Sequence, residues 1–125
     1  MVTISGDVAI QTTGAITFLN NARLEITPGS SLTVYCADNV TVDNDAQMNM
    51  NTGDPRVLRL ILTGTSRKVD VKTRSRLVGQ VYNQLGSLEV SGQGNDHSQF
   101  FGTFRGQSLI QLDKSRIRGD VATGS

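Results

Sequence analysis

The sequence predicts an all-β, single-domain parallel β-helix, that is, a β-solenoid with short strands and turn-rich corners. Three observations lead to this prediction: a length of 125 residues, a composition with thirteen glycines and no tryptophan, and apolar pairs that recur at a fixed interval. A chain of this length forms one domain around one core. Val, Ile and Leu are spread thinly between turn-forming residues, which favours short strands over helices.

The first half of the chain contains six apolar-x-apolar triplets, and each begins eight residues after the previous one. Side chains at i and i+2 of a strand point to the same side, so each triplet predicts a three-residue strand with one buried face. The stretches between them, such as QTTGA and TPGSS, are rich in turn residues and predict corners. The six pairs are Val8/Ile10, Ile16/Phe18, Leu24/Ile26, Leu32/Val34, Val40/Val42 and Met48/Met50.

Other folds explain this spacing less well. Apolar residues at i and i+2 lie about 200° apart around a helix axis and give no common buried face. A β-sandwich remains an alternative, but its strands are usually longer than three residues and do not keep so regular a spacing. A solenoid requires short strands and regular corners, because each triplet stacks on its equivalent one coil away. The handedness of the coil stays open.

The triplets continue at less regular intervals in the second half, as Leu58/Leu60, Val69/Val71, Leu88/Val90 and Ile110/Leu112. We expect one continuous core in which inward side chains stack in columns on successive coils. The residues predicted to form these columns are Val40, Val42, Val69, Val71, Leu88, Val90, Ile110 and Leu112.

A second repeat places a glycine between two apolar residues, each two positions away. The four units are Ile4–Val8, Leu77–Val81, Phe100–Phe104 and Ile117–Val121. Glycine inside a strand usually marks a narrow core or a close approach of two backbones. The last unit contains Arg118-Gly119-Asp120, a tripeptide used by many integrin ligands, and its position in the repeat predicts a coil element rather than a recognition loop.

We expect the solenoid to span residues 1–120, followed by a short tail over 121–125. No apolar run approaches the roughly 20 residues that span a bilayer, so we expect no membrane insertion in this segment. The single cysteine, Cys36, excludes an intramolecular disulfide. With His97 in a polar stretch and no phosphate-loop or nucleophile-elbow motif, the sequence predicts no enzyme and no cofactor.

The acidic residues Asp38, Asp43 and Asp45 follow one another closely in the first half. They could form an acidic ridge that binds Ca²⁺, but their spacing lacks the calcium-loop pattern. Aspartates and asparagines at corners commonly bond to their own backbone. We therefore expect no metal site.

Residues 31 to about 120 resemble the short β-helical domain of bacterial pilus-assembly and minor-pilin-like surface proteins. The resemblance rests on SLTVYCADNVTVDNDAQMNM, GDPRVLRLILTGTSRKVDV, LVGQVYN with SLEVSG, and FFGTFRGQSLIQLDKSRIRGD. It implies a non-enzymatic structural or adhesive module, in the cell envelope or outside the cell, whose partners are further copies or other envelope and pilus subunits.

A second resemblance, to the bactofilins, is confined to the units Gly6-Asp7-Val8 and Gly119-Asp120-Val121. Bactofilins are polymer-forming cytoskeletal β-helices, so this resemblance implies a self-polymerising module in the cytoplasm. A module that binds a polyanion or a carbohydrate is a third alternative, and the distribution of charge bears on it.

The charge is unevenly distributed along the chain. Residues 1–55 contain one arginine and six acidic residues, a net charge of −5, whereas residues 56–125 contain eleven Lys and Arg and five acidic residues, a net charge of +6. In a solenoid this asymmetry predicts an acidic end and a basic end. The basic end could attract an anionic polymer, pair with the acidic end of another copy, or be a solvated face without a partner.

The densest group of basic residues is the candidate ligand-binding site, an anion patch. It consists of Arg67, Lys68, Lys72, Arg74 and Arg76. We expect no sequence-specific nucleic-acid readout, because the aromatic residues mostly occupy inward strand positions and leave few rings for base stacking.

Overall fold

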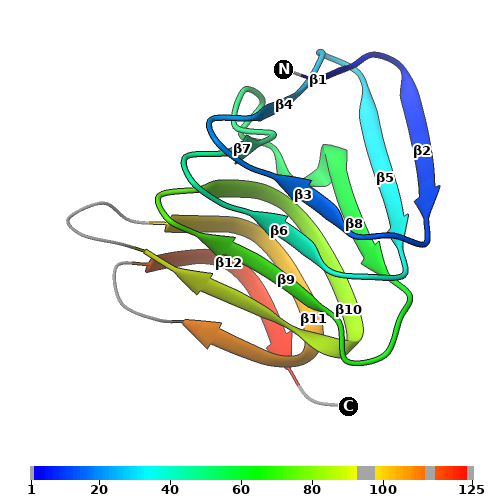
Figure 1. Cartoon of the computed structure of the whole chain (residues 1–125). Coiled ribbons are helices and arrows are strands. Elements are labelled where there is room, and N and C mark those ends of the chain that lie inside the picture. Colours follow the sequence, from blue (N-terminus) through cyan, green and yellow to red (C-terminus); the bar gives the residue numbers. More distant parts are fainter. Residues whose placement is uncertain (1, 93–97, 112–114, 124–125) are drawn as a thin grey trace.

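A computed structural model shows a β-solenoid in which the chain winds into about five stacked turns, with parallel pairing between successive turns (Figure 1). The structure describes residues 2–92, 98–111 and 115–123. Within these ranges the regular structure is strand except for one 3-10 turn, Pro55–Val57. The predicted all-β parallel β-helix is therefore confirmed.

The strands lie on three faces. The first face holds β1 (Val2–Ile4), β4 (Arg23–Ile26) and β7 (Gln47–Met48). The second holds β2 (Asp7–Thr12), β5 (Ser31–Cys36) and β8 (Leu58–Leu62). The third holds β3 (Ile16–Phe18), β6 (Val40–Val42) and β9 (Lys68–Lys72). The later strands bend around corners: β10 (Arg76–Ser91) and β11 (Ser98–Gln111) each follow all three faces, and β12 (Ser115–Thr123) follows the first two.

We number the turns as coils: β1–β3 form coil 1, β4–β6 coil 2, β7–β9 coil 3, β10 coil 4 and β11 coil 5, and β12 begins coil 6. Equivalent residues of coils 1 and 2 are 24 apart on the second and third faces, as with Val8 and Leu32, and 22 apart on the first face, as with Val2 and Leu24. Three of the predicted eight-residue units therefore make one coil. β12 continues through Thr123, three residues past the expected end of the solenoid.

The core is built from columns of stacked inward side chains, as predicted. On the third face two columns run through coils 2 to 4, and every member is fully buried. The columns are Val40, Val69 and Leu88, and Val42, Val71 and Val90. Each side chain covers the one below it, so the stack excludes water continuously along its axis.

The last pair of residues in the predicted columns is Ile110 and Leu112. Ile110 was predicted to point inward, and this is wrong: Leu109 pairs with Leu88, whereas Ile110 pairs with Glu89. Leu109 and Ile110 are adjacent and both apolar, so the pattern alone did not identify the inward one. Two fewer residues separate the second and third faces in β11 than in β10, which sets the actual register. Leu112 lies outside the described residues.

Met50 also departs from its predicted place in a triplet. β7 ends at Met48, and Asn49 adopts a left-handed backbone with φ +62°, so the chain turns away before Met50. Met48 is buried in the core, but Met50 is only partly buried. The buried Asn49 side chain stabilises the turn by donating to the carbonyl oxygens of Asp54 (2.9 Å) and Val78 (3.0 Å). Residues 49–57 thus form an outward corner between the first and second faces.

Glycines form a column where the first face meets the second. Gly79 pairs with Gly102, and Gly102 pairs with Gly119. A Cβ atom on Gly102 would overlap the carbonyl oxygen of Gly79, and one on Gly119 would overlap that of Gly102. The backbones therefore approach more closely than any other residue permits. The coil interpretation of Arg118-Gly119-Asp120 is confirmed, since this segment lies within β12 and follows the glycine register.

Candidate functional site

Four residues of the predicted anion patch lie in two groups at opposite edges of the third face, and the fifth, Arg76, lies beyond it at the start of β10. Arg67 and Lys68 lie where the chain enters β9, and Lys72 and Arg74 lie where it leaves. At about 3.3 Å per residue, Lys68 and Lys72 are about 13 Å apart along the strand. The sequence cluster is therefore not a single patch in the structure.

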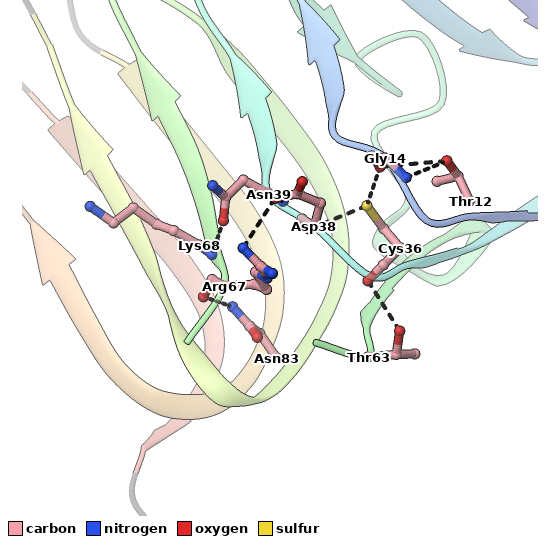
Figure 2. Close-up of polar contacts among 9 residues, drawn as sticks. All are labelled: Thr12, Gly14, Cys36, Asp38, Asn39, Thr63, Arg67, Lys68 and Asn83. Carbon is pink, nitrogen blue, oxygen red and sulfur yellow. Dashed lines mark hydrogen bonds and ion pairs between the residues drawn. The ribbon is translucent and has the colours of Figure 1, made fainter. Parts of the chain in front are cut away.

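The corner before β9 is held by polar contacts between coils (Figure 2). The Arg67 guanidinium forms an ion pair with Asp38 of the preceding coil at 3.4 Å, and the backbone N–H of Lys68 donates to Asn39 Oδ1 at 2.9 Å. From coil 4, the buried Asn83 amide donates to the carbonyl oxygens of Arg67 (2.8 Å) and Ser87 (3.0 Å). Asn83 thus adds a side-chain donor to two backbone acceptors at the bend, where the Arg67 oxygen also accepts from the backbone N–H of Ser87 at 3.1 Å. This corner joins three coils.

The corner after β9 is built on left-handed backbone positions. Asn21, Asp45 and Arg74 occupy the same place in coils 1, 2 and 3, with φ values of +67°, +66° and +62°. Asparagine and aspartate tolerate this conformation better than arginine does. The Arg74 guanidinium makes a two-pronged contact with Asp45, through Nε to Oδ1 at 2.9 Å and Nη2 to Oδ2 at 2.8 Å. This hydrogen-bonded contact holds the pKa of Asp45 below its ordinary value.

Between these corners the outer side of the third face carries mixed charge. Asp70 pairs in register with Glu89, and Lys68 forms an ion pair with Glu89 at 3.7 Å. Burial raises the pKa of Asp70, opposed by the nearby charges of Lys68 and Lys72. Carboxylates therefore offset much of the positive charge on this face.

Arg76 belongs to a different surface from the other four cations. It begins β10 on the first face, and the parallel register places Arg116 of β12 two strands away in the same row. Arg76, Arg116 and Arg118 line one hollow. The sequence cluster missed Arg116 and Arg118 because they lie about 40 positions later. The glycine repeat contained the missing signal, since it sets the register of residues 76–81 on 116–121.

The cysteine and the aspartates considered as thiol or metal sites have structural contacts within the coils. Cys36 is fully buried at the end of β5, and its thiol contacts the carbonyl oxygens of Asp38 (3.2 Å) and Gly14 (3.4 Å) (Figure 2). Asp38 and Asp45 face the arginines described above rather than one another. Among the described residues, no three His, Cys, Asp or Glu side chains gather as metal ligands would. His97 lies outside the described residues.

These features define a β-solenoid with polar corners that connect successive coils. A family model described as "Domain of unknown function (DUF7305)" matches residues 2–119, and the chain belongs to that family. No curated protein and no solved structure matches it. In the part of the chain that the structure describes, no helix has the length and apolar character to cross a membrane.

Proposed function

We propose that the domain is a non-enzymatic structural or adhesive module of a bacterial cell-surface or pilus-associated protein. The observation that carries this proposal is the way side chains connect one coil to the next at the corners. Asn39 binds the backbone of Lys68, Asp45 binds Arg74, and the Asn51 amide bonds to both backbone groups of Ile26. Such contacts favour a rigid rod over a deformable domain.

A rigid rod with flat faces suits a spacer or a presenting surface. Parallel pairing supplies hydrogen bonds along the axis, and the buried columns supply apolar contact at each step. The cell-surface and pilus setting comes from the sequence resemblance over residues 31–120.

The test is to locate the domain on the bacterium that produces it. An antibody against the domain is applied to intact and permeabilised cells and to appendages sheared from the surface. The proposal predicts label on intact cells and enrichment in the sheared fraction. A strain whose only copy carries Val71→Asp, a charge in the buried column, should lose the surface label or the attachment it supports. Label that requires permeabilisation would overturn the surface assignment.

A second candidate is a self-polymerising module, as the resemblance to bactofilins implies. The observation in its favour is at the ends of the stack: among the described strands, β12 pairs only with β11, and β1 only with β4. Open strand edges are templates for pairing with another chain. Negative-stain micrographs over a concentration series separate the candidates, because filaments that lengthen with concentration support polymerisation and a constant particle size argues against it.

A further inference from the structure

A hollow of about 280 Å³ lies on the first face over coils 4 to 6. Its lining follows from the register of three neighbouring strands. One row contains side chains at equivalent positions of β10, β11 and β12, and the next row lies two residues further along each strand, on the same side of the sheet. The rows are Arg76, Gln99 and Arg116, and Val78, Phe101 and Arg118.

The described lining of the hollow contains three arginines and no carboxylate. Neighbouring strands are about 4.8 Å apart, so Arg76 and Arg116 begin about 10 Å apart, and Arg118 is about 7 Å along β12 from Arg116. No aspartate or glutamate is among its described lining residues. None of the three arginines makes an ion pair or a side-chain hydrogen bond with another described residue, and Arg76 Nε is buried without a partner. An anion would relieve their mutual repulsion.

The rest of the lining is largely apolar. Phe101 is 40% exposed although it lies in the middle strand of the three, and Val78 lies beside it. Met50, which left its predicted core position, joins Gly53 from the outward corner 49–57 to form a wall. The apolar face of a ring can therefore lie against Phe101 while a charged group on that ring reaches the arginines. The Gln99 amide offers a donor and an acceptor between them.

We propose that this hollow binds an acidic sugar unit, a uronate, of a polysaccharide. Its volume is close to the lower limit of small-molecule sites, about 300 Å³, which suits one ring rather than a long ligand. A carboxylate accepts two parallel bonds from a guanidinium, and the C–H face of a sugar packs on an aromatic ring. This inference goes beyond the proposed function and does not depend on it.

A nucleic acid is the competing ligand, since it also combines anionic groups with flat rings. Non-specific single-strand binding uses several stacking rings along a basic groove. The hollow offers one exposed ring and is bounded by the corner 49–57. The observations therefore favour the uronate, and the nucleic acid becomes an outcome of the test.

The experiment measures binding to the intact protein by titration calorimetry at low salt. The probes are oligogalacturonate and oligoalginate, the methyl-esterified form of each, and an eight-residue thymidine oligonucleotide. We expect at least one free uronate oligomer to bind and its ester to bind at least tenfold more weakly. Arg118→Gln should weaken uronate binding about tenfold, because it removes a charge-assisted contact. Phe101→Ala should also weaken it.

Arg59→Gln is the matched control. Arg59 is an exposed arginine on the second face, where its Nε donates to Gln80 Oε1 at 3.2 Å, so this variant makes the same charge change away from the hollow. It should change uronate affinity less than twofold. The proposal is overturned if the esters bind as well as the acids, if the oligonucleotide binds more tightly than both uronates, if Arg59→Gln acts like Arg118→Gln, or if neither uronate binds. Any of these outcomes leaves the cell-surface test unaffected.

Discussion

Two groups of arginines in this solenoid have opposite surroundings. Arg67 and Arg74 lie at the corners of coil 3, and each contacts an aspartate of coil 2. Arg76, Arg116 and Arg118 lie on the first face around a hollow whose described lining contains no carboxylate. The first group connects coils, whereas the second presents positive charge to solvent. In a solenoid, the register on the neighbouring coil decides whether a cation is neutralised, and its neighbours in the sequence do not.

The substitution with the largest expected effect unfolds the domain and so disrupts both groups of arginines at once. Val71 is fully buried in a column of the third face, and Val71→Asp places an unpaired charge there. The cost should be several kcal/mol, enough to unfold a domain of ordinary stability. Circular dichroism should show no cooperative thermal transition near that of the parent protein. A preserved transition would mean that the column is not continuous.

The substitution with the next largest effect should disturb the arginines of the hollow and leave the corner arginines in place. Gly102→Ala introduces a Cβ that overlaps the Gly79 carbonyl oxygen beneath the hollow, far from the corners of coil 3. We expect a loss of about 2–3 kcal/mol in the free energy of unfolding, together with loss of uronate binding. Denaturant titration measures the first and calorimetry the second. The corresponding change Gly119→Ala should cost less, because β12 pairs with one described strand and can shift outward. Equal costs would contradict this account of the glycine column.

A smaller effect tests whether the corner arginines stabilise the fold. Arg74→Gln and Asp45→Asn should each lower Tm by about 2 °C at pH 7, and the double variant should lower it by less than their sum. The pKa of Asp45 is depressed in the folded protein, so this contribution is present above the ordinary carboxyl pKa of 3.8 and disappears as the pH falls through the folded value. Differential scanning calorimetry at pH 7 and pH 2.5 measures both. Arg116→Gln, which removes an equal charge at the hollow, where like charges surround it, should not lower Tm.

The substitution with the smallest expected effect should raise Tm rather than lower it. Burial raises the pKa of Asp70, so the folded state favours the protonated acid, and this stabilisation is present below the ordinary carboxyl pKa of 3.8 and is lost as the pH rises through the folded value. Asp70→Asn should therefore raise Tm by about 1–2 °C at pH 7 and lose this advantage near pH 3. A lower Tm at pH 7 would show that attraction to Lys68 and Lys72 outweighs the cost of burial.

Most of the fold could be predicted from the sequence, because burial of one face of each short strand determines both the spacing of the triplets and the way they stack. A strand with one buried face needs apolar residues at i and i+2, and three eight-residue units give the 24-residue spacing of Val8 and Leu32. The spacing varies in later coils, with 29 residues from Val40 to Val69 and 19 from Val69 to Leu88. The errors occurred where the local pattern was ambiguous. Leu109 and Ile110 compete for one inward position, and Asn49 turns the chain before Met50 can complete its triplet.

The candidate site was harder to predict. The five clustered cations were close in sequence, but β9 separates them and carboxylates of neighbouring coils contact three of them. The residues around the hollow come from three strands, and only the register brings Arg76 to Arg116 and Arg118. Aligning the glycine units would have indicated this proximity. The outward position of Met50, and with it one wall, depends on a corner whose path no periodicity encodes.

The parallel ladders also determine how the domain responds to a mechanical load. β1 and β12 lie at opposite ends of the stack (Figure 1), so a pull between these ends acts along the direction of the hydrogen bonds that join the coils. The ladders are then loaded one after another, and the coil with the weakest contacts yields first. A released coil with the 24-residue spacing of Val8 and Leu32 adds roughly 80 Å of extended chain. Under tension the domain should lengthen in discrete steps, and each step should dissipate part of the applied mechanical energy.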